Sequence, residues 1–339
     1  MNTKNTFTTI TLSLYAIAMF YLSGIFGIIE FIISLVIYTL IFYFFHFIWI
    51  KIRKKPIMYF GDFTQYFLNR VSVLLIVITT IIGGLAYLFN EIIPAPMPEY
   101  TITDGTKTVK FQAMSHIGTP NFYNQIVTNL TNFKKEGGVY FFEGVKPGTK
   151  ENSEKFNKAI GIQFDDDLYK NFSKLYGVTN QDNSKFMGLE NDLDFNVDLN
   201  MDEIVSLYDE KMSQKPEGEK EYKSNLPIDA NKTIMDALVG LNDRQLKLLV
   251  YINQAILNFI IGSENTQSFL TDNFANKDLF DVILGERNQV LAEAIINSEH
   301  DKIYITYGLL HFKGVMKLLQ EHDSKWKIYG EKYLYPIKN

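Results

Sequence analysis

The segments Phe111-Gln-Ala-Met-Ser-His116 and Tyr304-Ile-Thr-Tyr-Gly308-Leu-Leu-His311 share one pattern: a short apolar run ends in a histidine, and an amphipathic segment follows it. The chain has only five histidines in 339 residues. Strand ends in an α/β sheet lie at the edge where such folds bind their ligands. The repeated pattern therefore predicts an α/β domain with a site at that edge.

Working outward from the first segment, Thr108 to Met114 is predicted to be a strand and Thr119 to Phe133 a helix with regular apolar spacing. Gly137 and Gly138 end the helix, and a second strand covers 139–143. A strand, helix and strand within about 35 residues is the size of a right-handed parallel crossover. We therefore expect His116 and Glu143 just beyond the carboxyl ends of neighbouring strands.

The second segment predicts a helix over 286–298, a strand over 303–307 and a helix that begins at His311 and continues through Leu319. This arrangement places Arg287 in a first helical turn, where the helix dipole favours anions, and such an exception often marks a site. The expected fold is a central mixed sheet with flanking helices, preceded by membrane helices.

The first 95 residues indicate a membrane anchor. Residues 7–50 are mostly apolar, with Glu30 as the one charged residue, and one straight helix of that length would be about twice as long as a bilayer is thick. We expect a turn near Ser23 to Gly27 and three spans, at about 7–25, 31–50 and 71–91, with two spans as the alternative. The anchor covers 1–93, a proline-rich spacer 94–100, and a water-soluble domain 101–339.

Basic residues indicate how the anchor is oriented. Lys51, Arg53, Lys54, Lys55 and Arg70 lie between the second and third spans, whereas the turn near Gly27 has none. Since basic loops stay in the cytoplasm, the protein is predicted to be a multi-pass cell-membrane protein with its soluble domain on the extracytoplasmic side. The apolar stretch 246–261 is short for a span and predicts a buried or membrane-resting helix, a dimer face or a lid.

Charge and cysteine content exclude several classes. The net charge is -5, and because the first 95 residues are basic overall, the soluble part carries about -8. Nucleic acid is therefore not an expected partner. The chain contains no cysteine, which excludes disulfides and thiolate metal sites.

The order of motifs resembles the TraB/PrgY/GumN family, which includes the Tiki proteins. The family pattern is a GxxH motif after a first strand, a glutamate after the next strand, an arginine in a late helix and a second GxxH motif. Here these are Ala113-Met-Ser-His116, Phe141-Phe-Glu143, Glu286-Arg287-Asn288 and Gly308-Leu-Leu-His311 with Gly314. Ala113 departs from the pattern. The likeness covers about Phe111 to Leu319 and is closest to a multi-pass membrane branch of bacterial members.

Two imidazoles and a carboxylate at one edge are a donor set for a divalent metal ion. The prediction is that His116, Glu143 and His311 bind manganese, cobalt or zinc, among which such donors discriminate poorly. Arg287 and Asn288 are the candidate catalytic residues, for an oxyanion or a substrate carboxylate. Asp198, Ser115 and Gly308 are expected around them. The resemblance implies a metal-dependent hydrolase that acts on a peptide or a related amide or ester.

Other interpretations of these residues stay open. Glu143 can form a structural ion pair with Arg287, and each histidine can be a packed or capping residue. A shared site can also be non-catalytic, in a regulatory module that sequesters a secreted peptide. The partners expected are a peptide or small secreted substrate, the lipid bilayer and a second copy in a homo-oligomer.

Overall fold

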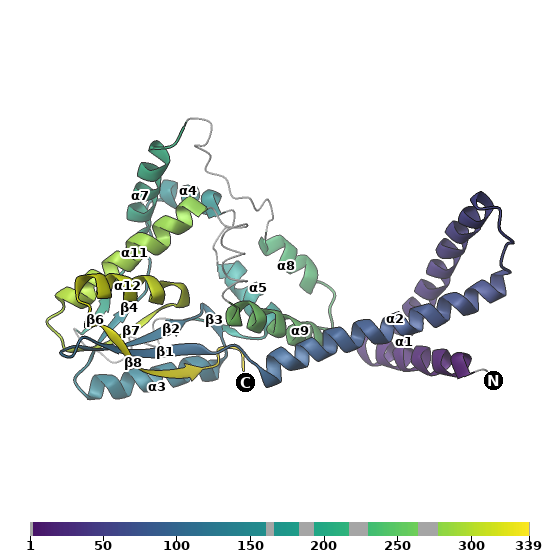
Figure 1. Cartoon of the computed structure of the whole chain (residues 1–339), viewed down its shortest axis with the longest axis horizontal. Helices are drawn as coiled ribbons and strands as arrows, with labels where there is room; N and C mark the ends of the chain where they lie inside the picture. The colour runs from purple at the N-terminus through teal and green to yellow at the C-terminus, as the bar shows by residue number, and fades with distance from the viewer. Residues whose placement is uncertain (1–2, 161–165, 183–192, 217–229, 264–276, 339) are drawn as a thin grey trace. The chain divides into compact units, whose positions relative to one another are not determined.

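The computed structural model describes residues 3–160, 166–182, 193–216, 230–263 and 277–338 (Figure 1). The sequence also predicts a charged, proline-bearing linker or flap at 215–225, which falls mainly outside these residues. The chain forms two compact units: one consists of Met1–Leu88 with Gly240–Ile252, and the other of Phe89–Val239 with Asn253–Asn339. Each unit is described separately.

The first unit is built from two long apolar helices, α1 (Thr3–Ile52) and α2 (Phe60–Tyr87). Helix α1 is broken at Gly24, whose φ of 66° and ψ of -153° lie outside the helical range. Glycine reaches a positive φ without steric cost, so the chain can reverse here. The break lies inside the predicted turn, and it divides α1 into the first and second predicted spans.

Side-chain contacts set the direction of the three segments. Thr8 hydrogen-bonds to Asn69, and Tyr15 donates to the Leu75 carbonyl at 2.7 Å, so the start of α1 runs parallel to α2. After the break, Phe42 stacks near Phe67 and His46 near Phe63, so this part of α1 runs antiparallel to α2. Successive segments therefore run in opposite directions.

The break at Gly24 is capped by the start of α9 (Asp243–Gly262). Asn242 Nδ2 donates to the Leu22 carbonyl at 2.6 Å, and Arg244 Nη1 donates to the Tyr21 carbonyl at 2.6 Å. A broken helix leaves such carbonyls without their intrahelical donors. Polar side chains from a distant part of the sequence thus satisfy the exposed end of the first segment.

In the described part of the chain, three helices are long and apolar enough to cross a membrane: α1, α2 together with the π-helix η1 (Leu88–Ile92), and α9. The chain is therefore membrane-associated. The expectation that the α9 region is short for a span was based on residues 246–261. Helix α9 extends to 20 residues because it begins at Asp243, so length does not exclude a span.

The second unit contains a mixed six-stranded sheet in the order β6-β4-β7-β2-β1-β8. Strands β6 (Asp194–Asn196), β4 (Val139–Phe142), β7 (Lys302–Gly308) and β2 (Thr108–Met114) are parallel. Strands β1 (Met97–Thr103) and β8 (Lys327–Leu334) continue the sheet antiparallel. A two-stranded sheet pairs β3 (Ile117–Gly118) with β5 (Thr179–Asn180). The predicted mixed sheet is confirmed.

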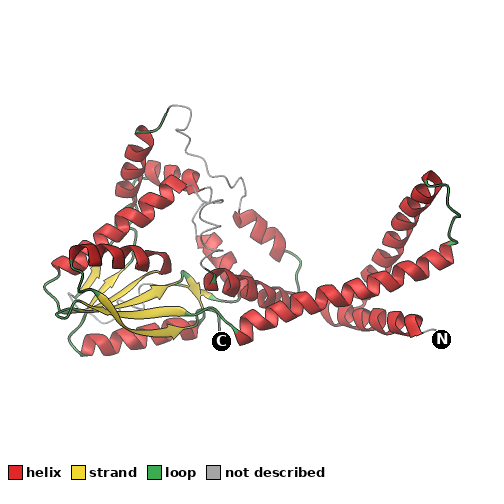
Figure 2. Cartoon of the chain, in the orientation of Figure 1, coloured by secondary structure: helices red, strands yellow, loops and turns green. Residues whose placement is uncertain are grey.

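Helices cover both faces of the sheet (Figure 2). Helix α3 (Pro120–Lys135) lies on one face, and α11 (Lys277–Asn297) and α12 (Phe312–His322) lie on the other (Figure 1). The 3-10 turn η3 (Leu309–His311) joins β7 to α12. The structure also describes the helices α4 (Lys150–Ile160), α5 (Asp166–Tyr176), α7 (Met201–Ser213) and α8 (Ala230–Leu238).

The core follows from the strand pattern. Phe111 and Ile305 in β2 and β7 are fully buried, as parallel strands covered on both faces require. Phe312 at the start of α12 stacks on Tyr100 with ring centroids 3.7 Å apart. Phe133 of α3 packs near Tyr304 on the opposite face. The sheet is thus packed between two layers of helices, and this packing positions the carboxyl ends of its parallel strands.

Three expectations were wrong. The strands that precede His116 and Glu143 are not neighbours, because β7 lies between β2 and β4. The expected spacer overlaps β1, which begins at Met97 and pairs with β8 through Pro98. Arg287 lies in the middle of α11, so the helix-dipole argument does not apply. The helix starts earlier because Leu279 and Val282, which are buried, extend its apolar face.

Candidate functional site

The site is built where β4 and β7 end side by side. Phe142 pairs with Thr306, and the Glu143 amide donates to the Thr306 carbonyl at 3.0 Å. Two residues further along β7, the Gly308 amide donates to Glu143 Oε2 at 2.6 Å. The Glu143 carboxylate is therefore held against the end of the neighbouring strand rather than free in solution.

Asp198 and Arg287 form a bidentate ion pair beside this carboxylate. Arg287 Nε donates to Asp198 Oδ1 at 2.7 Å, and Nη2 donates to Oδ2 at 2.8 Å. The Asp198 side chain is completely buried, and it also accepts from the amides of Gly144 and Leu199 at 3.0 and 2.8 Å. Two charge-assisted bonds in a planar fork fix the guanidinium plane.

Arg287 also bridges the two carboxylates, since its Nη2 donates to Glu143 Oε1 at 2.6 Å. Burial alone would raise the pKa of Glu143. The charges of Arg287, and after it of His116 and His311, outweigh burial and leave the pKa of Glu143 below its usual value. Glu143 is therefore an anion at neutral pH. The ion pair between Glu143 and Arg287, which was the alternative interpretation of these residues, is present.

His311 is oriented by Asn288. Its Nδ1 lies 2.7 Å from Asn288 Oδ1, and because a carbonyl oxygen only accepts, Nδ1 carries the proton. Nε2 of the neutral ring then has a lone pair. Burial, and then the charge of Arg287, lower the pKa of His311 to about 4, so the ring is neutral at pH 7. Such a ring suits a base or a metal ligand.

Gly314 makes room for this arrangement. A Cβ at this position would collide with the Asn288 amide nitrogen. Asn288 can therefore pack against α12 and reach His311 only if residue 314 lacks a side chain. At Gly308, by contrast, a Cβ would lie 3.4 Å from Glu143 Oε2, which is ordinary contact. The two glycines of the second motif thus have different roles.

The first histidine motif, which ends at His116, is held by fewer contacts to the site. The His116 side chain is exposed, yet it is near enough for its charge to lower the pKa of both Glu143 and His311. Ser115 Oγ donates to the Ile117 carbonyl at 2.8 Å, so it shapes its own turn. The structure thus brings Glu143, Asp198, Arg287 and the His311–Asn288 pair together, with His116 at the margin and Ser115 outside.

Whether these residues fit a metal ion can be judged from their donor atoms. An imidazole whose Nδ1 hydrogen is held by an amide oxygen, with Nε2 unengaged, is the usual state of a ligating histidine. Two imidazoles and a carboxylate also match a three-ligand site. Among the described residues, however, no three His, Asp or Glu side chains are grouped closely enough to hold an ion. The donor types fit, and the predicted metal site stays a prediction.

Comparison with known proteins does not assign the chain to a family. No protein-family model, curated protein or solved structure matches the chain. The interpretation of the site therefore depends on its own chemistry.

Tyr307 is a member of the site that the sequence reasoning missed. Its hydroxyl donates to Asp198 Oδ1 at 3.1 Å, and its ring lies 5.4 Å from the Arg287 guanidinium carbon. The ring also meets His311 edge to face, with centroids 4.8 Å apart. Its place one residue before Gly308, at the end of an apolar strand, was the available signal.

Proposed function

We propose that this chain is a membrane-anchored hydrolase that acts on a peptide, or on a related amide or ester, at the edge formed by Glu143, Arg287 and His311. One observation carries the proposal. His311 Nε2 and Arg287 Nη1 are both unengaged in the described part of the chain, while every other polar atom of these two side chains is fixed by Asn288, Asp198 or Glu143. Each of the two fixed side chains thus retains one atom that could bind a ligand.

The chemistry of the open atoms suits acyl transfer. Arg287 Nη1 can donate to a substrate carbonyl oxygen as negative charge develops on it, and a pre-fixed donor of this kind costs no reorganisation during reaction. Asp198 holds the guanidinium in that position. His311 Nε2 can take a proton from an attacking water, with Asn288 keeping the ring in one tautomer. Glu143 would stabilise the resulting imidazolium.

A divalent ion would be held by His116, Glu143 and His311, and when bound it would supply Lewis acidity and a water of lowered pKa. With a metal ion bound, Asn288 would orient His311 as a metal ligand and not as a general base. The exposed His116 side chain would have to move inward. The motif order that resembles the TraB/PrgY/GumN family supports this metal-dependent form.

We also propose that the site faces the extracytoplasmic side. Asn242 and Arg244 at the start of α9 cap the break at Gly24, and strongly polar groups are stable at an interface rather than in hydrocarbon. This corner is opposite the loop with the basic residues 51–55, which the positive-inside rule places in the cytoplasm. Helix α2 runs parallel to the first segment of α1 and so ends on the side of this corner, and the second unit follows it in the sequence.

A second candidate is a module that sequesters a peptide without cleaving it. The observation that favours it is that Glu143 and Asp198 are both paired with Arg287. Such a network can serve as a rigid binding wall. Arg287 Nη1 would then bind a peptide carboxylate.

The test is a mass-spectrometric screen of a peptide library with the full chain in lipid nanodiscs. Samples are treated with EDTA and then supplied with manganese, cobalt or zinc. Cleavage products that appear only when the protein is present support the hydrolase. Cleavage that requires added metal indicates the metal-dependent form, and cleavage that persists in EDTA indicates the form in which His311 is the base. Peptides that are retained by the nanodiscs without cleavage would favour sequestration and contradict the hydrolase.

A further inference from the structure

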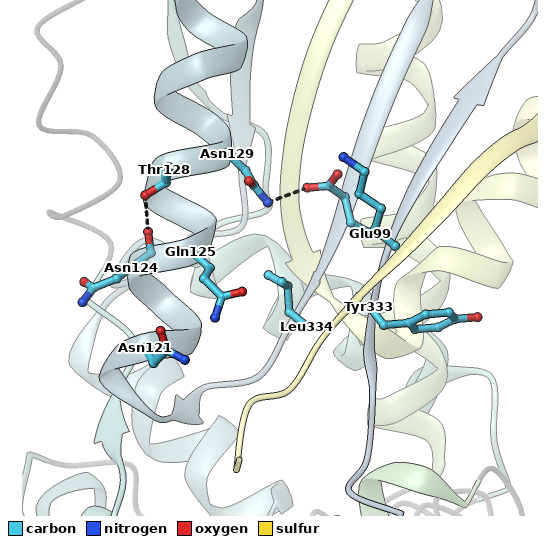
Figure 3. Close-up of a pocket in the computed structure, with 9 residues that line it drawn as sticks. Glu99, Asn121, Asn124, Gln125, Thr128, Asn129, Tyr333 and Leu334 are labelled. Carbon is cyan, nitrogen blue, oxygen red and sulfur yellow. Dashed lines mark hydrogen bonds between the residues drawn. The ribbon is translucent and has the colours of Figure 1, made fainter. Parts of the chain in front are cut away.

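An open cavity of about 640 Å³ lies between α3 and the strands β1 and β8, and it shares no residue with the site described above. Figure 3 shows its lining, with α3 on one side and Glu99 and Leu334 from the strands on the other. Cavities of this volume hold ligands the size of one or two sugar rings. Most of the residues that line it carry a polar group.

The wall on α3 is a stripe of uncharged hydrogen-bonding side chains. Asn121, Asn124, Gln125, Thr128 and Asn129 recur at the three- and four-residue spacing that places side chains on one helical face. The opposite face of α3 is buried through residues such as Phe122 and Ile126. Each carboxamide can donate and accept, but none carries a charge. We call these five residues the α3 polar stripe.

The floor is formed by Glu99, whose side chain is 2 % exposed. Both of its hydrogen bonds reach the same oxygen: Asn129 Nδ2 donates to Oε2 at 3.2 Å, and the Tyr304 hydroxyl donates to Oε2 at 2.9 Å. Burial, and then the Glu99 charge, raise the pKa of Tyr304 well above its usual value, which keeps its hydroxyl a donor. Oε1 accepts no hydrogen bond from the part of the chain that the structure describes.

The cavity carries one charge of each sign. Lys332 on β8 is the register partner of Glu99 on β1, so the two side chains leave the same face of the sheet. No ion pair joins them within the described ranges, and Lys332 is exposed at the rim. A ligand with net charge of either sign would meet one attractive and one repulsive group. The balance favours a neutral ligand.

We propose that this cavity binds a neutral saccharide. The hydroxyl groups of a sugar both donate and accept, as the α3 polar stripe does, and Glu99 Oε1 offers a strong acceptor at the floor. An apolar ligand would displace water from Glu99 Oε1 and from the exposed carboxamides of the stripe without offering them a hydrogen bond, which costs free energy for each polar group buried. Leu334, together with the carbon atoms of the neighbouring lining side chains, supplies apolar surface for one face of a sugar ring.

The experiment uses the full chain in lipid nanodiscs, which avoids sugar-based detergents. Glucose, N-acetylglucosamine and lactose are titrated by saturation-transfer NMR and calorimetry, with butylamine and glucuronate as charged probes. Gln125→Ala removes one donor and acceptor of the stripe. Glu99→Gln retains an oxygen for Asn129 and Tyr304 but turns an amide donor toward the cavity. Asn132→Ala, an exposed carboxamide of α3 outside the lining, is the matched control.

The expected result is binding of at least one of the three sugars, weakened about three- to tenfold by Gln125→Ala and by Glu99→Gln and unchanged in Asn132→Ala. Thermal melts of all variants report whether each one folds. Absence of binding by the three sugars, tighter binding of butylamine or glucuronate, or sugar binding that neither variant weakens would each overturn the proposal.

Discussion

Replacing Arg287 by methionine tests the ion network most sharply. The Arg287 side chain is 7 % exposed, and it is the one guanidinium paired with both Glu143 and Asp198, which are 12 % and 0 % exposed. Removing one partner of a buried ion pair costs about 3 to 5 kcal/mol, because the remaining charge has no compensation. For a domain of this size we expect the melting temperature to fall by about 6 to 20 °C.

The pH dependence of this loss gives a second, independent readout. In the wild type the folded pKa of Glu143 lies below the unfolded value of 4.5, so its contribution to stability is present above pH 4.5 and is lost as pH falls through the folded pKa. In Arg287→Met, burial raises the pKa of Glu143 above the unfolded value. The variant then gains a proton on folding, so the stability difference from wild type shrinks as pH is lowered from 7 towards 4.

The assay is thermal unfolding of the full chain in nanodiscs, followed by the fluorescence of Trp326, which is buried in the sheet unit. A Trp49→Phe background removes the other tryptophan. Lys317→Ala, which breaks only an exposed pair with Glu321, is the matched control and should leave the midpoint unchanged. The reasoning would be refuted if Arg287→Met lowered the melting temperature by less than about 2 °C. It would also be refuted if the stability difference between the variant and wild type stayed constant from pH 7 to 4.

Three further predictions concern the groups around the network. Gly314→Ala should displace Asn288 from His311 and lower hydrolysis about 10- to 100-fold, whereas Gly285→Ala, with open space at its Cβ, should leave it unchanged; equal rates in the two variants would contradict the role of residue 314. Tyr307→Phe removes one hydrogen bond to a buried carboxylate and should cost about 1 to 3 kcal/mol in denaturant unfolding, and an unchanged midpoint would count against that bond. Because the folded pKa of His311 is about 4 and the unfolded value is 6.5, metal-free protein should lose stability as pH falls from 6.5 to 4, and His311→Gln should remove that slope.

The strands and helices that carry the motifs could be predicted from local pattern. Strands 108–114 and 303–307, and the helix that follows His116, match β2, β7 and α3 within one or two residues. Alternating or continuous apolar runs with glycine at their ends are strong local signals. Strand order was not predictable in the same way, because β7 enters between β2 and β4 from almost two hundred residues away.

The site residues, like the strands, were predictable from the sequence only where local motifs indicate them. Glu143, Arg287, Asn288 and His311 were proposed together from motif order, and the structure forms two hydrogen-bonded pairs from them, Glu143 with Arg287 and Asn288 with His311. The Tyr307 ring packs against both Arg287 and His311. The role of Tyr307 depends on contacts between elements distant in sequence, which no local spacing encodes. Arg287 was chosen for a helix-start position that it does not occupy, so part of the reasoning was wrong although the residue belongs to the site.

The most direct test of the central claim compares hydrolysis by two single-histidine variants. His311→Ala removes the imidazole oriented by Asn288, and His322→Ala removes an exposed imidazole near the end of the same helix. The rate constant for one peptide found in the library screen is measured for both variants and for wild type in nanodiscs at pH 7, alongside melts that confirm folding. The account predicts a loss of at least about 100-fold for His311→Ala alone, in the range of general-base catalysis. Wild-type hydrolysis by folded His311→Ala would contradict it.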